Sequence, residues 1–530
     1  MHRFFPLLYH IPAGSSWVMV VWLCLWRLNG ACQPLEYTVS PTYEDETMKL
    51  RITVQFDGTH TGKSYLNYQS NQFGVDGQMD FISFPDQMPG VSIFKEPDSN
   101  RFVVIHAPDA RVQATYLLTD LQGKMPFYNY CCFNPIIKPT YFHVQAGHLL
   151  ATPSHYWDGP DDIQTVHFNM ENFPPEWVLH SSFGKGPKQH VALRNAQLGY
   201  AIFVGGDFRR YAFKVANQPV YFVTRGEWTQ FTDDTLRNLL QKTVEGHRVF
   251  WQDFSDTLYS VTFLPIDDAP WSDKAKSASC GGSGLTNSFM SFATNNPGID
   301  YDYIRYVYVH ELMHRWIGIK IENANEEKQY WFSEGFTEYF TLKNSLRYGF
   351  IDVNKFLQQL NDDFMAEHYS STTKLFPNDS LNYERFWNGG RDWEKLPYRR
   401  GCIYAFHLDN YIRKKSKGAQ NLDMMMRQIL KAVQANPNQK LDHLFFTRMV
   451  RQSAGKKGVL DFQKFIEKGI PIDFAQAPLP IGLNLEVVDM PKINKFEPPG
   501  KTKPEIVKNI PQFRRNPNIS EQALKAALLQ

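Results

Sequence analysis

The chain has 530 residues, of which 43% are hydrophobic and 21% charged, and this composition excludes a disordered, collagenous or coiled-coil protein. Lys and Arg number 56 against 54 Asp and Glu, so the formal net charge is only +2 and gives no global attraction to nucleic acid. At roughly 150 residues per domain, this length predicts about three or four domains.

Residues 1–31 are typical of an export signal. Arg3 precedes an apolar run, Trp17–Trp26, which is too short to span a bilayer, and the small residue Ala31 follows. We expect cleavage there and an exported protein, periplasmic or secreted. Two alternatives would tie the protein to a membrane: an uncleaved signal, or a lipid on Cys32. The lipid is disfavoured because Asn29 stands where bacterial lipoprotein signals usually carry Leu.

Cysteines are few for an exported chain of this size. No CxxC spacing is present to hold a metal or exchange disulfides, and the adjacent Cys131 and Cys132 cannot easily bond to each other. Stability must therefore come from the apolar core.

Residues 32–225 read as an N-terminal β domain. Short stretches of alternating polarity, such as Lys49–Phe56, Arg101–Ala107 and Gln197–Gly206, are separated by Gly, Pro, Asn and Asp. This pattern predicts an all-β unit.

Residues 226–345 form a second predicted domain, of mixed type. Thr232 is a helix cap, and leucines then recur at helical spacing. An alternating segment follows at Tyr259–Ile266, then a glycine-rich turn at Gly281–Gly282, the segment Leu285–Ala293 and a helix over Tyr303–Ile317.

Residues 346–477 show mostly helical apolar spacing, as in Cys402–Lys415, Leu422–Val433 and Leu441–Val450. Residues 478–530 are a Pro- and Lys-rich tail. We expect the tail to be a solvated linker that ends in a short amphipathic helix over Ser520–Gln530.

The chemistry is carried by the segment VHELMHRWIG, in which His310 and His314 are four residues apart. Residues at i and i+4 project from the same face of a helix, so the two imidazoles can share one Zn²⁺. Glu311 lies on the same helix and can act beside the metal as a general base.

A catalytic zinc site usually takes three protein ligands, and Glu334 in the segment WFSEGFTEYF is the candidate for the third. Nineteen residues separate it from His314, which is enough for a loop between two antiparallel helices. The alternative is a salt-bridged surface Glu. The aromatic residues around Glu334 favour a buried face instead, where a carboxylate is costly without a metal or partner.

The segments HELMHRWIG and SEGFTEYF resemble the gluzincin metallopeptidases, specifically the zinc aminopeptidases related to aminopeptidase N, while LEYTVSP and FIEKGIPIDF are more similar to the bacterial glycyl aminopeptidases. The resemblance implies a multidomain α+β fold. Its parts would be an N-terminal β-sandwich-like domain, a thermolysin-like catalytic domain with zinc between two helices, and a helical C-terminal domain that closes the cleft.

The resemblance also implies a role for Tyr398. In the segment LPYRRG it occupies a Tyr-x-Lys/Arg-Gly pattern whose phenol, in these families, assists the tetrahedral intermediate. A packing tyrosine is the alternative.

One segment departs from the family pattern. These aminopeptidases carry a Glu that pairs with the substrate's free amine, whereas this chain reads GGSGLTNSFM, with Gly284 at the Glu position. We expect Gly281, Gly282, Ser283 and Gly284 to bind substrate through the backbone of an exposed strand edge. The nearby Glu338 is a candidate replacement for the missing anchor.

The sequence thus predicts a zinc-dependent peptidase with Zn²⁺ on His310, His314 and Glu334, most similar to aminopeptidases but with an altered anchor for the substrate N-terminus. The alternatives are an endopeptidase of the same fold and a non-catalytic peptide-binding or scaffold protein. The expected partner is a peptide or protein substrate and no nucleic acid, and nothing in the sequence indicates an oligomeric state.

Overall fold

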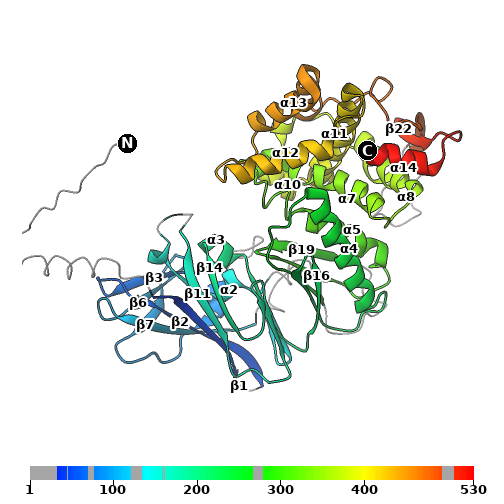
Figure 1. The fold of residues 1–530 in the computed structure, drawn as a ribbon. Coiled ribbons are helices and arrows are strands. Elements are labelled where there is room, and N and C mark those ends of the chain that lie inside the picture. Colours follow the sequence, from blue (N-terminus) through cyan, green and yellow to red (C-terminus); the bar gives the residue numbers. More distant parts are fainter. Residues whose placement is uncertain are drawn as a thin grey trace, which may run out of the picture.

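The computed structural model describes residues 33–44, 46–69, 77–120, 134–157, 159, 162–266, 279–491 and 506–530. Figure 1 shows a strand-rich N-terminal region in blue to cyan, a mixed region in green and a helical region in yellow to red. The predicted multidomain α+β class is confirmed. The export signal, Cys32 and the Cys131–Cys132 pair lie outside the described residues. The described cysteines, Cys280 and Cys402, are free thiols.

Three sheets build the N-terminal region. Their strands follow alternating patterns such as that of β2 (Thr47–Asp57), where Leu50, Ile52 and Val54 are fully buried and their neighbours are partly exposed. Apolar side chains from all three sheets meet in one core, for example Ile52, Val104 and Phe142.

The first sheet has the order β14 (Lys188–Leu193), β11 (Gln164–Met170), β1 (Leu35–Glu44), β2, β7 (Arg111–Leu118) and β4 (Ile82–Ser83). The second has the order β10 (Thr152–Pro153), β3 (Lys63–Asn67), β6 (Arg101–Ile105) and β5 (Ser92–Lys95). The third has the order β13 (Gly184–Lys185), β12 (Val178–Ser181), β15 (Ile202–Gly206), β9 (Tyr141–Gln145) and β8 (Ile136–Lys138). Short helical elements connect them: η1 (Gln78–Phe81), α2 (Ala146–Leu149), η3 (Ser154–Tyr156) and α3 (Asn195–Gly199).

The mixed region contains a five-stranded sheet in the order β16 (Arg209–Val215), β17 (Gln218–Thr224), β18 (Tyr259–Pro265), β20 (Ser288–Ala293) and β19 (Cys280–Leu285). Helix α4 (Asp233–Trp251) is capped by Thr232, as predicted, and connects the parallel strands β17 and β18. The predicted domain boundary at residues 225/226 therefore divides this sheet, because β16 and β17 pair with β18 and not with the N-terminal sheets.

The glycine-rich segment is part of a strand, so the turn predicted at Gly281–Gly282 is wrong. Both residues lie in β19, which pairs antiparallel with β20 at the edge of the sheet. The turn comes later, at Thr286 and Asn287, where Asn287 has a left-handed φ of 50°. Among the described strands, β19 pairs with β20 alone, so the predicted exposed strand edge is present in this part of the chain.

Helices follow β20 in the order α5 (Tyr301–Met313), α6 (Glu326–Ser333), α7 (Gly335–Arg347), α8 (Val353–Gln359), the π-helical turn η4 (Leu360–Ala366), α9 (Glu367–Ser370), η5 (Asn378–Ser380), α10 (Tyr383–Asn388), α11 (Arg391–Ser416), α12 (Leu422–Ala435), α13 (His443–Phe462) and η6 (Gln463–Glu467). Asp or Asn side chains cap many of them: Asp300, Asn325 and Asp442, for example, each accept a hydrogen bond from a backbone N–H in the first turn. The helical segments predicted after residue 345 are confirmed.

The two helices that face each other most closely, α7 and α11, touch through glycines. A Cβ on Gly401 would lie 2.7 Å from the Cα of Gly335 and 2.0 Å from the carbonyl oxygen of Trp331. The backbones of α6, α7 and α11 are therefore in contact, which only residues without a side chain allow at these positions.

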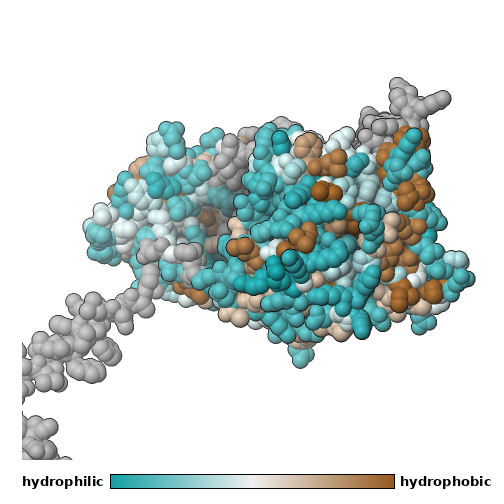
Figure 2. Space-filling model, turned by 90° about the horizontal axis from the view of Figure 1, so that it is seen from above, coloured by the Kyte–Doolittle hydropathy of each residue, from teal (hydrophilic) through white to brown (hydrophobic). Residues whose placement is uncertain are grey.

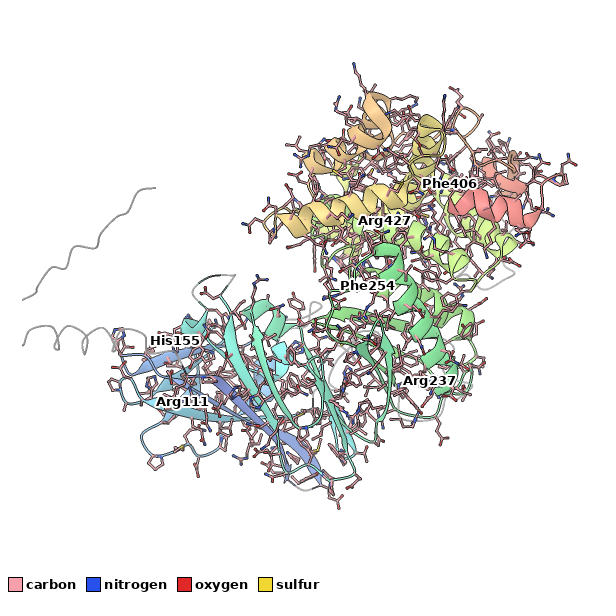
Figure 3. All side chains as sticks on the ribbon, in the orientation of Figure 1. Arg111, His155, Arg237, Phe254, Phe406 and Arg427 are labelled. Atoms are coloured by element: carbon pink, nitrogen blue, oxygen red, sulfur yellow. The ribbon has the colours of Figure 1, made fainter. Side chains whose placement is uncertain are left out.

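The C-terminal tail is not simply a solvated linker. Strands β21 (Leu483–Pro491) and β22 (Ile506–Arg515) pair as a two-stranded sheet, and α14 (Glu521–Leu529) is the predicted terminal helix. The ring of Phe406 on α11, labelled in Figure 3, lies 5.2 Å from that of the buried Phe513 on β22. The sequence pattern missed this packing because Pro and Lys dominate the tail. The predicted linker segment Pro498–Pro504 lies outside the described residues.

A buried polar layer joins the third sheet to the mixed sheet. His180 lies 2.9 Å from the hydroxyl of Ser260, Ser182 lies 2.7 Å from Ser288, and the ring of His143 lies 3.4 Å from the hydroxyl of Thr262. Burial lowers the pKa of His143 and of His180 to about 3, so both imidazoles are neutral in the folded protein.

We expect the free energy of unfolding to fall as the pH falls from 7.5 to 5. In the folded protein, His143, His148 and His180 each have a pKa of about 3, whereas the ordinary value is 6.5. Between these values the unfolded chain therefore binds protons that the folded protein does not bind. Each of these histidines should lower the free energy of unfolding by about 2 kcal/mol at pH 5, and urea unfolding can measure this change. Burial also lowers the pKa of His247 and His368, so His180→Gln, which can still bond Ser260, should remove about 2 kcal/mol of the total fall between pH 7.5 and 5. The same fall in the variant as in wild type would contradict the assignment.

None of the helices within the described ranges has both the length and the apolar character that crossing a membrane requires. Seen from above, the surface is mostly hydrophilic, with separate hydrophobic patches (Figure 2).

Candidate metal centre

Helix α5 places His310 and His314 on one face. It begins after Asp300, whose side chain accepts a hydrogen bond from the N–H of Tyr303, and it ends at Met313 with His314 as the C-cap, four residues before the predicted end at Ile317. His310 is 7% exposed and the side chain of His314 is 18% exposed, so both imidazoles lie mostly below the surface.

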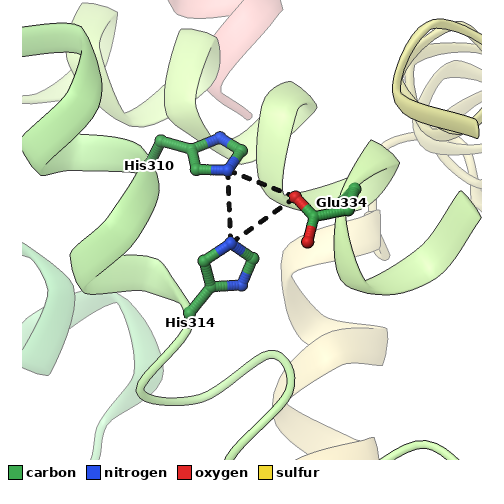
Figure 4. Close-up of side chains that lie close together, drawn as sticks. All are labelled: His310, His314 and Glu334. Atoms are coloured by element: carbon green, nitrogen blue, oxygen red, sulfur yellow. Dashed lines mark hydrogen bonds and ion pairs between the residues drawn. The ribbon is translucent and has the colours of Figure 1, made fainter. Parts of the chain in front are cut away.

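Glu334 joins two helices. It closes α6 and opens α7, and its carbonyl oxygen accepts a hydrogen bond from the N–H of Glu338 one turn later. The sequence placed Glu334 on a single following helix, whereas the structure puts it at the junction between two, with its side chain directed at the two imidazoles of α5 (Figure 4).

Three donor atoms form a nearly equilateral triangle (Figure 4). The Nε2 atoms of His310 and His314 are 3.2 Å apart, and the Oε2 atom of Glu334 lies 3.4 Å from the first and 3.6 Å from the second. In the part of the chain that the structure describes, these residues are the one group of three or more potential ligands whose donor atoms lie within 4.8 Å of one another.

The triangle has the size that zinc requires. Zn–N and Zn–O bonds of about 2.0–2.1 Å at tetrahedral angles separate neighbouring ligand atoms by about 3.3–3.4 Å. Two imidazoles and one carboxylate are also a donor set typical of catalytic zinc, with a fourth position left open. The residues present therefore fit Zn²⁺.

A backbone carbonyl orients the ring of His314 from the side opposite the metal site. Its Nδ1 atom lies 3.1 Å from the carbonyl oxygen of Ile317, which fixes the tautomer that donates from Nδ1 and leaves the Nε2 lone pair toward the site. Burial opposes ionisation of Glu334, but His314 and His310 outweigh it and hold the pKa of this carboxyl well below its usual range. Glu334 is therefore an anionic ligand.

A cavity of about 710 Å³ opens beside the triangle and is lined by the predicted catalytic residues Glu311 and Tyr398. The rings of Tyr398 and His310 are nearly parallel, with centroids 6.5 Å apart. Burial, reinforced by Glu334, raises the pKa of the Tyr398 phenol, so it remains a hydroxyl donor. Burial also raises the pKa of Glu311, and Glu334 adds to this shift while His310 opposes it.

Strand β19 forms one wall of the cavity. Gly282, Ser283 and Gly284 line it, as predicted for substrate contact. Gly281, on the same strand, is not among the lining residues. The structure thus brings together every predicted site residue except Gly281.

Several lining residues were not predicted. Tyr306 precedes His310 by one turn of α5, and Lys395 precedes Tyr398 by one turn of α11, so helical spacing from the predicted residues is a signal that finds both. Ile319 follows the zinc-binding motif closely. Tyr200 comes from the N-terminal region after α3, and no local pattern connects it to the site.

Comparison with known proteins relates the sequence and the fold of this chain to peptidases. Residues 304–395, which include both imidazoles and Glu334, match the family model described as M61 glycyl aminopeptidase. The chain is similar to zinc aminopeptidases. Its fold is that of a solved aminopeptidase N family protein from Idiomarina loihiensis, with a TM-score of 0.67 and 14% identity over 86% of this chain and 79% of that one.

Two curated relatives share a shorter stretch. Leucine aminopeptidase 2 of Aspergillus fumigatus is 33% identical over 141 residues, and leucine aminopeptidase 2 of Emericella nidulans is 31% identical over 143. Each match covers 25% of this chain and 21% of the relative. The similarity to these aminopeptidases is thus local, while the likeness of fold extends over most of the chain.

Proposed function

We propose that this protein is a zinc-dependent peptidase of the aminopeptidase type with an altered anchor for the substrate N-terminus. The observation that carries the proposal is the triangle of His310, His314 and Glu334, whose edges of 3.2–3.6 Å match a tetrahedral zinc site. It lies at the bottom of a cavity beside an exposed strand edge, which is the setting that an extended peptide needs.

The side chains around the triangle have complementary tasks. When bound, zinc supplies a Lewis acid that polarises the scissile carbonyl and lowers the pKa of water. Glu311 takes the proton from the attacking water and passes it to the leaving amine. Tyr398 donates a hydrogen bond to the oxygen that becomes negatively charged. The edge of β19 holds the peptide through its main chain.

The altered anchor is the feature that separates an aminopeptidase from an endopeptidase. An ammonium group needs a carboxylate, and Gly284 provides none on the β19 wall. Glu326 lines the cavity, but its two oxygens accept hydrogen bonds from Ser333 and Asn323. A wall without a carboxylate to bind the substrate N-terminus can also admit a peptide that extends beyond that point. This observation favours endopeptidase action as the second candidate.

We further propose export to the periplasm or the outside of the cell, supported by the signal-like residues 1–31. A lipid on Cys32 would attach the protein to a membrane, and mass spectrometry of the mature N-terminus distinguishes the two forms.

The test uses one peptide pool presented with free and with acetylated N-termini to the mature zinc-loaded protein. Release of single N-terminal residues from the free pool alone would establish an aminopeptidase, and internal cuts in both pools an endopeptidase. Zinc-depleted protein is the control and should be inactive until zinc returns. No cleavage of either pool by protein that holds zinc would overturn the proposal and leave a non-catalytic peptide-binding protein or scaffold.

A further inference from the structure

Glu338 is a buried carboxylate that the proposed reaction does not use. It lies on α7, one turn after Glu334, with its side chain only 10% exposed. Its Oε2 atom is 3.5 Å from Nδ1 of His310, the ring nitrogen that faces away from the other two ligands. A carboxylate in this place is costly to bury unless donors satisfy it.

One hydrogen-bond donor, a phenol, reaches the oxygen that faces His310. The hydroxyl of Tyr306 donates a hydrogen bond to the same Oε2 atom. The ring of Tyr306 also lies nearly parallel to that of His310, with centroids 6.3 Å apart, because the two residues are one turn apart on α5. Burial and then Glu338 raise the pKa of Tyr306, so this hydroxyl keeps its proton and remains a donor.

The two imidazoles of the site are therefore oriented in different ways. His314 faces a backbone carbonyl, that of Ile317, whereas His310 faces an anionic side chain. A carboxylate on Nδ1 selects the tautomer with a free Nε2 lone pair, restrains the ring and makes that nitrogen a stronger ligand.

We infer that Glu338, held by Tyr306, is a positioning residue that orients His310 and strengthens its bond to the metal. Glu338 also lines the cavity, but its Oε2 atom already accepts a hydrogen bond from the phenol of Tyr306, and this argues against Glu338 as the anchor for the substrate amine. The inference rests on the proposed zinc site and extends it to a tyrosine–glutamate–histidine chain.

The test is the affinity for zinc, measured by competition with a chromogenic chelator on the full chain. Glu338→Gln keeps the volume of the side chain and removes its charge, and it should weaken zinc binding by about 10- to 100-fold. Tyr306→Phe should weaken it by less, because Glu338 stays in place but loses a donor. The matched control is Tyr303→Phe, which changes a 43% exposed tyrosine on the same helix and should leave zinc affinity unchanged.

Two further readouts separate positioning from a general effect on folding. The thermal unfolding midpoint of the metal-free Glu338→Gln protein should match that of metal-free wild type, and the visible spectrum of the cobalt-substituted variant should shift because one imidazole is held differently. Zinc affinity within twofold of wild type would overturn the inference. So would a loss of stability in the metal-free variant as large as its loss of zinc-binding free energy. Absence of stoichiometric zinc binding by wild type would instead overturn the proposed function itself.

Discussion

Glu311→Gln should lower kcat for peptide cleavage by about 10²- to 10⁴-fold while the zinc content stays at that of wild type. The carboxamide keeps the size of the side chain but cannot accept a proton from water. Glu311 lines the cavity and is not one of the three donors in the triangle, so the metal site should be unaffected.

The measurement combines turnover of a cleaved peptide with metal analysis of the same preparation. Glu245→Gln is a suitable control, because Glu245 is an exposed residue of α4 away from the cavity lining. Turnover within tenfold of wild type would show that another group accepts the proton.

Gly401→Ala should damage both stability and turnover. The added methyl group would overlap the carbonyl oxygen of Trp331, 2.0 Å away, and press on Gly335, so α11 must shift away from α6 and α7. Overpacking of this kind typically costs about 1–3 kcal/mol. Because Tyr398 is on α11 and Glu334 immediately precedes Gly335, a shift of about 1 Å could reduce kcat by 10²-fold.

Urea unfolding and peptide turnover measure the two effects. Gly199→Ala is the matched control, since a Cβ at Gly199 meets no atom within 4 Å, and it should be neutral in both assays. If Gly401→Ala keeps wild-type stability, the helix backbones are not in contact at this position.

The metal centre was largely predictable because its geometry is local. The four-residue spacing of His310 and His314 fixes their relation on any helix, and aromatic neighbours marked Glu334 as buried. Tyr306 obeys the same spacing, which places it near His310, but only the fold brings Glu338 against its hydroxyl and so reveals its role.

Long-range pairings were beyond the sequence pattern. Strands β16 and β17 alternate like their N-terminal neighbours, and only their pairing with β18 assigns them to the mixed sheet. The segment containing Gly281 and Gly282 looked like a turn because glycine weakens a strand, yet the neighbouring strand β20 supplies the hydrogen bonds that keep it extended. In each case the deciding interaction comes from a distant part of the chain.

The glycine-rich edge of β19 also determines where selectivity must arise. A peptide that pairs with this edge is held through its main chain, and Gly282 and Gly284 offer no side chains with which to distinguish one residue from another. Discrimination between substrate side chains then falls to other residues that line the cavity, among them Tyr200, Ile319 and Lys395, which present an aromatic ring, an aliphatic chain and a cation. Substitutions at these three positions would change which residue is preferred and leave the reacting groups in place.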